Sequence, residues 1–214
     1  MARSKCIVVK VGTSSVFDER RALNKEILQC LVSDIACLWD RGKEVILVAS
    51  GAMAMGGEHG DSTLIAAARG QHMLMSEYAV LFGQHGISVG QMLVTRDNFV
   101  SAEHSVRFSE TIATATRENT LMIVNENDAI ANMGQVTFGE NDALAVAVSI
   151  ACSAGLMVFI SYRNSNVAGR GGWSAKSAAL SEAKRNGINT GIIDIRADRH
   201  ALLGLLRSRG ELHA

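Results

Sequence analysis

Two lysines in this 214-residue chain lie beside glycines and hydroxyl-bearing residues, a combination that suits the binding of phosphate. Lys10 opens the string Lys10-Val-Gly-Thr-Ser-Ser15, and Lys176 closes the string Gly169-Arg-Gly-Gly-Trp-Ser-Ala-Lys176. Backbone N–H groups in a glycine-rich turn can bind phosphate oxygens while an ammonium group balances their charge. Taken singly, each string is also compatible with a plain turn or loop that carries a solvated lysine. Neither is a Walker loop, because G-x-x-x-x-G-K-[ST] occurs nowhere in the chain.

Polar residues elsewhere could bind a small charged molecule. The string Ser50-Gly51-Ala52 has no bulky side chain at Gly51, so its backbone N–H groups could approach a ligand. Two further clusters, Asn125-Glu-Asn-Asp128 and Gly139-Glu-Asn-Asp142, offer amide and carboxylate oxygens that can hold an ammonium group and orient lysines through ion pairs. Turn formation is the alternative for both clusters, because Asn, Asp and Gly are the usual turn formers.

These polar strings border short apolar runs that alternate with longer helical patterns. Runs rich in β-branched residues predict strands, and apolar residues at three- and four-residue steps predict helices. Strands are expected at residues 6–11, 44–49, 87–95, 121–124, 156–161 and 190–195, and helices at 24–41, 65–85, 105–118, 141–153, 174–185 and 198–209. Such alternation is typical of a parallel sheet with helices on both faces. Ligands of such sheets lie beyond the carboxyl ends of the strands, where several of the polar strings stand.

The composition narrows the class of protein. Lys plus Arg and Asp plus Glu both number 21, so the chain has no net field to attract nucleic acid or an anionic membrane. No apolar run reaches the roughly 18 residues of a membrane span. The four cysteines form no C-x-x-C pair and have no histidine at zinc spacing, which is typical of reduced thiols in the cytoplasm. We expect a cytoplasmic protein with one domain over residues 1–214, no metal ligands, and no nucleic-acid or membrane partner.

The helix expected at residues 65–85 carries Met73, Met75 and Tyr78 among other large apolar residues at helical spacing. Such residues belong to a core or a subunit interface far more often than to a cofactor site. This helix is therefore our candidate for the interface of a homo-oligomer.

In chain order, these strings and their neighbours resemble the amino-acid-kinase family, and within it the catalytic domain of the glutamate 5-kinases. The likeness runs from Ile7 to about Val158 and returns in the glycine-rich string. The long third motif and the NEND and GEND pair set the glutamate 5-kinases apart from the wider family. The motifs are VVKVGTSSV, ILVASGAMAMG, GQHMLMSEYAVLFGQHGISVGQMLVTRDNF, IVNENDAI, FGENDALAVAVSIACSAGL and GRGGWSAK.

The resemblance implies an α/β fold, a three-layer α/β/α sandwich with a mainly parallel central sheet like that of the carbamate kinases. It implies that ATP, with Mg²⁺, and L-glutamate lie end to end over the carboxyl edge of the sheet. The side-chain carboxylate of glutamate would attack the γ-phosphoryl group and give γ-glutamyl phosphate, in the first step of proline biosynthesis. Such a transfer depends mainly on positioning and on neutralising the charge of the transferred group.

The motifs also imply roles for individual residues. The catalytic residues would be Lys10, Lys176 and Asp142, the last holding the two lysines in place. The residues that bind glutamate would be Ser50, Gly51, Asp128 and Asn141. Those that bind the nucleotide would be Lys10, Gly12, Thr13, Ser161, Gly171, Gly172 and Lys176.

The chain departs from the family pattern after the fifth expected strand. Ser161-Tyr162-Arg163-Asn164 stands where the family has a Thr-Asp pair and then Gly-Leu-Tyr-Thr, and a stretch that helps to form the adenine and ribose pocket is missing. Arg170 replaces the usual Thr, Trp173 the usual Met, and Glu140 a common Asp.

These departures keep an alternative open. A non-catalytic relative could bind glutamate or a related metabolite as a regulatory or scaffold subunit. The retention of Lys10, Asp142 and Lys176 favours the kinase, because a pure binder needs no charges directed at a phosphoryl group. We expect no RNA-binding-type domain of the kind often appended to the family's C-terminus.

Overall fold

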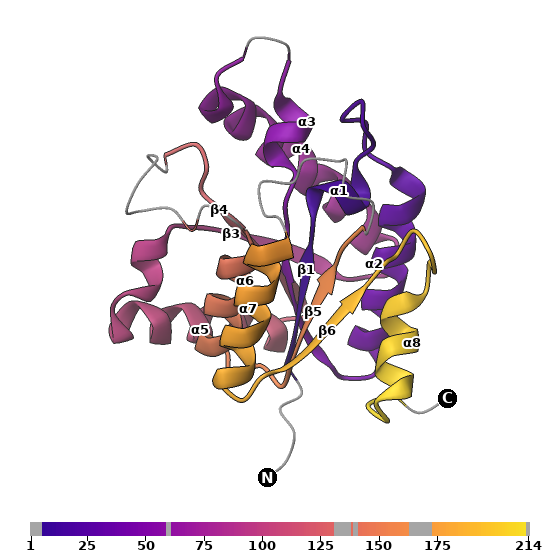
Figure 1. Cartoon of the computed structure of the whole chain (residues 1–214), viewed down its shortest axis with the longest axis vertical. Coiled ribbons are helices and arrows are strands. Elements are labelled where there is room, and N and C mark those ends of the chain that lie inside the picture. The colour runs from indigo at the N-terminus through magenta and orange to yellow at the C-terminus, as the bar shows by residue number, and fades with distance from the viewer. Residues whose placement is uncertain (1–5, 59–60, 131–137, 139–140, 163–172, 213–214) are drawn as a thin grey trace.

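A parallel sheet runs through the middle of the computed structural model (Figure 1). The structure describes residues 6–58, 61–130, 138, 141–162 and 173–212. Within these residues six strands pair in the order β3-β4-β2-β1-β5-β6, and every pair is parallel. The strands are β1 (Cys6–Val11), β2 (Glu44–Val48), β3 (Ser88–Val94), β4 (Thr120–Glu126), β5 (Leu156–Ile160) and β6 (Asn189–Ile193).

The central strands form because their sequences suit a sheet that is buried on both faces. They are nearly continuous runs of Val, Ile, Leu and Met, which fit the pleated surface of a covered parallel sheet. Successive side chains point to opposite faces, so Val9 and Leu47 belong to one half of the core and Val8 and Ile46 to the other. The sheet is therefore held between two apolar layers.

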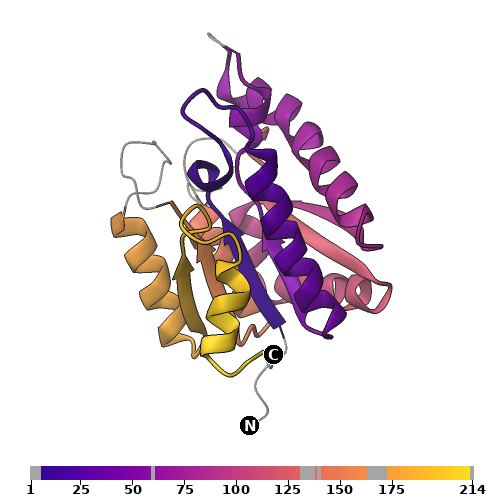
Figure 2. The ribbon, with the colours of Figure 1, turned by 90° about the vertical axis from the view of Figure 1, so that its right-hand side faces the viewer.

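Helices cover both faces of this sheet (Figures 1 and 2), and the predicted three-layer α/β/α sandwich is confirmed. One face is covered by α2 (Lys25–Asp40), α4 (Thr63–Gly83) and α8 (Ala201–Ser208). The other is covered by α5 (Ala102–Arg117), α6 (Asn141–Ala151) and α7 (Trp173–Arg185). Within the described ranges no helix combines the length and the apolar character that crossing a membrane requires.

Three one-turn helices stand where the sequence analysis expects no helix. They are α1 (Thr13–Val16), α3 (Ala52–Gly56) and the 3-10 helix η1 (Arg96–Phe99), and they follow β1, β2 and β3. The pattern could not reveal them, because a single turn is too short to show a 3.6-residue period.

The fourth strand is longer than the sequence predicts. We expected it at residues 121–124, but β4 continues to Glu126, and Asn125 pairs in register with Leu93 of β3. Polar residues are rare in buried strands, so the pattern ended the strand too early. As a result, the side chains of Asn125 and Glu126 are buried at the carboxyl end of the sheet.

The strand order places β1 in the middle of the sheet, between β2 and β5. The chain passes from β1 to β2 on one side and returns to β5 on the other. Parallel sheets bind ligands where the order reverses in this way, beyond the carboxyl ends of the strands. The turns after β1, β2 and β5 are therefore the place to look for a functional site.

Candidate active site

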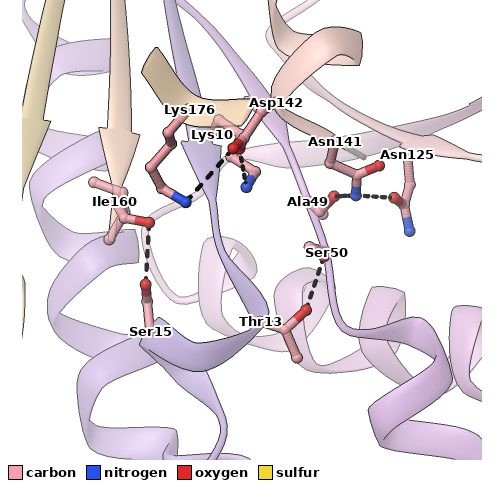
Figure 3. A network of polar contacts seen from close by, with 10 residues as sticks. All are labelled: Lys10, Thr13, Ser15, Ala49, Ser50, Asn125, Asn141, Asp142, Ile160 and Lys176. Atoms are coloured by element: carbon pink, nitrogen blue, oxygen red, sulfur yellow. Dashed lines mark hydrogen bonds and ion pairs between the residues drawn. The ribbon is translucent and has the colours of Figure 1, made fainter. Parts of the chain in front are cut away.

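A carboxylate lies between two lysines at the carboxyl edge of the sheet (Figure 3). Lys10 is the next-to-last residue of β1, and Asp142, in the first turn of α6, forms an ion pair with it. Lys176 comes from the first turn of α7, and its Nζ lies 3.5 Å from Oδ2 of Asp142. The structure thus brings together the two lysines and the aspartate that the sequence assigned to catalysis.

Little water reaches these three side chains. The side chain of Asp142 is 3% exposed, that of Lys10 8% and that of Lys176 15%. The Nζ of Lys10 also lies 5.8 Å from the ring centre of Phe159, so part of its surroundings is aromatic. Counted over these three side chains alone, two ammonium groups and one carboxylate carry one net positive charge. In a poorly hydrated place such an excess attracts an anion more strongly than it would in water.

The turn after β1 is tied to the strand beside it. The N–H of Gly12 donates to the carbonyl oxygen of Ile160 at 3.1 Å, and the hydroxyl of Ser15 donates to the same oxygen at 3.0 Å. A Cβ added to Gly12 would lie 3.9 Å from Nζ of Lys10, so the backbone of the turn runs beside the ammonium group. The predicted phosphate-binding string therefore lies next to the lysine pair.

The turn after β2 adjoins the turn after β1. The hydroxyl oxygens of Thr13 and Ser50 are 2.8 Å apart, which joins the two turns by a hydrogen bond (Figure 3). Gly51 has a φ of 110°, a left-handed conformation that glycine adopts without steric strain. A Cβ added to Gly70 of α4 would overlap the carbonyl oxygen of Ala52, so α3 packs directly on the backbone of α4. The predicted substrate turn is held in place by these contacts.

Three side-chain amides form a hydrogen-bonded chain behind the turn after β2. The Nδ2 of Asn141 donates to the carbonyl oxygen of Ala49 at 2.6 Å and to Oδ1 of Asn125 at 2.9 Å. The Nδ2 of Asn125 donates to Oε1 of Gln71, on α4, at 2.7 Å. Asn125 is 1% exposed and Gln71 8%, whereas Asn141 is only partly buried. Of the three amides Gln71, Asn125 and Asn141, only Asn141 is among the residues that the sequence assigned to substrate binding.

Sequence reasoning missed Gln71 as part of this edge. The apolar spacing of the helix that carries it predicts a core or subunit-interface element. A signal did exist, since Gln71 shares a helix face with Leu74 and Tyr78 and is the polar residue on that buried stripe. Its contact with Asn125 spans 54 positions of the chain, and no local pattern reports such a contact.

The remaining predicted residues lie at or near the same edge where the structure describes them. Asp128 is half-buried in the turn after β4. Ser161 follows β5, and its N–H donates to the carbonyl oxygen of Ile193 at 2.9 Å. Gly171 and Gly172 lie outside the described residues. The roles of all these residues stay predictions.

A hollow of about 330 Å³ opens beside Ser161, at residues that the sequence did not single out as a site. It is lined by Asp18, Glu19, Arg20, Tyr162 and Arg196. The guanidinium of Arg196 lies 4.3 Å from the ring centre of Tyr162, and its Nη2 donates to the carbonyl oxygen of Phe17 at 2.7 Å. An aromatic ring and charged groups of both signs therefore stand next to the turn that the sequence predicts to bind phosphate.

Two of the cysteines lie at the opposite edge of the sheet, away from Lys10, Asp142 and Lys176. Cys6 begins β1, at the far end of the strand from Lys10. Burial raises the pKa of the Cys6 and Cys152 thiols to about 12. Both are therefore protonated at neutral pH and are poor nucleophiles.

Solved structures of kinases share this architecture. UMP kinase from Ureaplasma parvum superposes with a TM-score of 0.64 at 11% identity, over 97% of this chain and 96% of that one. Carbamate kinase from Giardia lamblia, bound to AMP-PNP, gives a TM-score of 0.64 at 11% identity, over 95% and 97%. At these identities the likeness concerns the fold.

Curated relatives match at higher identity. Glutamate 5-kinase from Bacillus cereus is 39% identical over 163 residues, which cover 72% of this chain and 44% of that protein. Glutamate 5-kinase from Alkaliphilus oremlandii is 32% identical over 170 residues, which cover 75% and 64%. The chain thus spans between about two fifths and two thirds of the length of these relatives. The model of the amino acid kinase family matches residues 5–164, and the chain belongs to that family.

Proposed function

We propose that this chain transfers the γ-phosphoryl group of ATP to the side-chain carboxylate of L-glutamate, giving γ-glutamyl phosphate and ADP. The observation that carries the proposal is the meeting of Lys10 and Lys176 at Asp142, with little exposure to water. The likeness to proteins named glutamate 5-kinase supports glutamate as the acceptor. A place in proline biosynthesis and a cytoplasmic location belong to the same proposal.

The proposed reaction needs positive charge more than it needs a base. A carboxylate acceptor is already ionised at neutral pH, so no side chain has to remove a proton from it. One of its oxygens attacks the γ-phosphorus in line while the bond from phosphorus to the bridging oxygen of ADP breaks. Lys10 and Lys176 would neutralise the negative charge of the transferred group. Mg²⁺, which accompanies ATP as part of the substrate, would add to this neutralisation.

The two adjoining turns would bring the reactants together. The hydrogen bond between Thr13 and Ser50 joins the phosphate-binding turn to the substrate turn. Glutamate bound on the side of Ser50 and Asn141 would therefore present its side-chain carboxylate to a phosphoryl group held on the side of Thr13. Holding two reactants in line removes much of the entropic barrier to transfer.

We place the nucleoside part of ATP in the hollow beside Ser161. Its volume of about 330 Å³ lies at the small end of the range for ligand sites. Tyr162 offers a ring for stacking, and Arg196 with Asp18 offers polar partners for a ribose. These residues would take over from the family's Thr-Asp segment, which this chain lacks.

A non-catalytic binder of glutamate or a related metabolite is the second candidate. The observation that favours it is the end of the family match at residue 164, directly after Tyr162 stands in place of the family's Asp. A binder would keep the substrate turn and the amide chain but would have no turnover.

One assay separates the two functions. The full chain is incubated with MgATP, glutamate and hydroxylamine, and hydroxamate formation is measured for the parent and for Lys176→Ala. The kinase proposal expects hydroxamate from the parent and a loss of at least about a hundredfold in the variant, since a charge aimed at the transition state is removed. Lys184→Ala, on the exposed last turn of the same helix, is the matched control and should keep full activity.

The opposite results are equally informative. If the parent shows no turnover but glutamate still protects it against thermal unfolding, the protein is a non-catalytic binder. Equal activity in the parent and in Lys176→Ala would overturn the role of the lysine pair.

A further inference from the structure

Gln71, Asn125 and Asn141 form a chain of hydrogen-bonded side-chain amides. Two backbone groups fix which amide atoms donate and which accept along it. Amide nitrogen and oxygen atoms are hard to tell apart by shape, so their assignment depends on what surrounds them. The carbonyl oxygen of Ala49 can only accept, so the atom of Asn141 that faces it must be the nitrogen. The N–H of Glu126 can only donate, so the atom of Asn125 that lies 2.9 Å from it must be the oxygen.

This direction decides what Asn141 can offer to a ligand. Its nitrogen donates one hydrogen to Ala49 and the other to Asn125, so both of its donors are used within the protein (Figure 3). Its Oδ1 accepts no hydrogen bond from the described residues. Because Asn141 is only partly buried, this oxygen is the atom that a ligand can meet. A lone carbonyl-type oxygen selects a donor such as an ammonium group and disfavours a carboxylate.

Gln71, at the other end of the amide chain, has a hydrogen-bond donor without an acceptor among the described residues. Since Asn125 points its nitrogen at Gln71, the facing atom of Gln71 must be the oxygen. The Nε2 of Gln71 is then buried, and no described residue accepts from it. Buried donors usually have partners, so this position is unfavourable for a glutamine that serves the core alone.

We propose that Gln71 is a positioning residue for amino-acid binding. By accepting from the nitrogen of Asn125, Gln71 acts with the N–H of Glu126 to hold the oxygen of Asn125 toward Asn141. The two contacts together keep the oxygen of Asn141 toward the ligand's ammonium group. The inference rests on the proposed function and extends it to a residue on α4 that the ligand does not touch. Its consequence is specificity, because a dicarboxylate without an ammonium group gains nothing from the amide chain.

The test compares the affinities of glutamate and glutarate, which has the same two carboxylates and no ammonium group. Gln71→Met keeps the size of the side chain and removes the acceptor for Asn125. We expect calorimetry to show about tenfold weaker glutamate binding, the equivalent of one hydrogen bond to a charged group, and unchanged glutarate binding. In the hydroxamate assay the KM for glutamate should rise by a similar factor while kcat stays within about threefold.

Two further variants sharpen the result. Gln71→Glu keeps an oxygen facing Asn125 and removes Nε2, so glutamate binding should stay within about threefold of the parent. This variant decides the case if Gln71→Met does not fold, because a tenfold loss in Gln71→Glu would overturn the proposal. Gln84→Met, at the exposed end of α4, is the matched control and should behave as the parent.

The outcomes separate this inference from the proposed function. A parent that binds no glutamate overturns both. A parent that binds glutamate, with Gln71→Met unchanged, overturns the positioning role alone. Equal losses for glutamate and glutarate in Gln71→Met would show a general disturbance of the site and would also overturn the role.

Discussion

At the scale of single residues, the Asp142 carboxylate stabilises the two poorly hydrated ammonium groups of Lys10 and Lys176. Removing one partner from a buried ion pair costs about 3–5 kcal/mol, because the remaining charge has neither water nor a partner. We expect Asp142→Ala to lower the free energy of unfolding by about 3 kcal/mol, the low end of that range, since Lys176 is partly exposed. Urea denaturation of the two proteins measures the difference.

An exposed ion pair gives the control for this prediction. Glu103 and Arg107 pair on α5 at 2.8 Å, with side chains that are 72% and 73% exposed. Glu103→Ala should change stability little, because water and salt screen such a pair. Added sulfate should recover part of the loss in Asp142→Ala by acting as a counter-ion to the lysines, and should have no such effect on Glu103→Ala. Similar losses in the two variants would contradict the importance of the buried carboxylate.

Short strings of residues were enough to find the charged part of the site. Lys10 and Lys176 stand beside glycines, and Asp142 lies in a polar cluster, so each carried a local signal. Gln71 and Arg196 carried no comparable signal. They matter through partners far along the chain, such as the carbonyl oxygen of Phe17 for Arg196, and only folding brings those partners close.

At the scale of elements, the contact between α3 and α4 sets the position of the turn after β2, the predicted substrate turn. Replacing glycine by alanine inside a helix usually stabilises it by up to about 1 kcal/mol. At Gly70 we expect the opposite sign, because the added Cβ would overlap the backbone of Ala52. Gly70→Ala should lose about 1–3 kcal/mol, as overpacked cores do, and should weaken glutamate binding by displacing the adjoining Gly51. Thermal unfolding with and without glutamate measures both effects.

The same helix supplies a matched control. Gly83 ends α4, and a Cβ added there would meet nothing within 4 Å. Gly83→Ala should therefore be neutral or slightly stabilising. A Gly70→Ala variant as stable as Gly83→Ala would mean that α3 does not press on α4.

A second element contact attaches α8 to the rest of the molecule. Asp34, buried on α2, is hydrogen-bonded to Nδ1 of His200 at 2.7 Å and accepts from the N–H of Leu203 at 3.4 Å. It thus lies at the start of α8, where a negative charge is favourable. Burial nevertheless raises the pKa of the Asp34 carboxyl above its ordinary value, against the opposing effect of His200. The loss of water around the carboxyl therefore raises its pKa by more than His200 and the N–H of Leu203 lower it.

The direction of this pKa shift predicts a pH dependence. Below about pH 4 the carboxyl is protonated in both the folded and the unfolded chain, so it favours neither. As pH rises from the ordinary pKa of the unfolded chain to the raised pKa of the folded one, the unfolded chain loses its proton first, and this group makes the fold progressively less stable. Asp34→Asn lacks this titration. Urea unfolding from pH 4 to 7 should show the variant gaining stability relative to the parent as pH rises, and a relative loss would contradict the shift.

Element types were easier to predict than element ends. The strands and long helices were anticipated because each repeats its period several times, as α2 does with a buried face of Leu28, Leu31 and Ile35. Ends depend on single contacts, and the extension of β4 through Asn125 is stabilised by partners on α4 and α6. The sequence could not report those partners.

At the scale of the whole molecule, the layers could be predicted and the strand order could not. Alternating strands and helices require a covered parallel sheet. The order β3-β4-β2-β1-β5-β6 depends on which helix covers which face, and neighbouring strands of this sheet have similar apolar sequences. The motif resemblance added what periodicity could not, because it implied that residues after β1, β2 and β5 take part in one site at the carboxyl edge of the sheet.

The outer face of α4 bears on the assembly of the molecule, and self-association stays a prediction. Met73 and Val80 are 41% and 61% exposed, and Ile65, in the first turn of the same helix, is 49% exposed. Large apolar side chains grouped on one helix face are typical of a covered surface. We expect light scattering to show a dimer or larger assembly that Val80→Glu shifts toward the monomer, because a charge there would have to lose its water on association. Val100→Glu, at a residue 76% exposed outside this helix, is the control and should not change the mass. A parent that is monomeric at every concentration would leave α4 with a purely internal role.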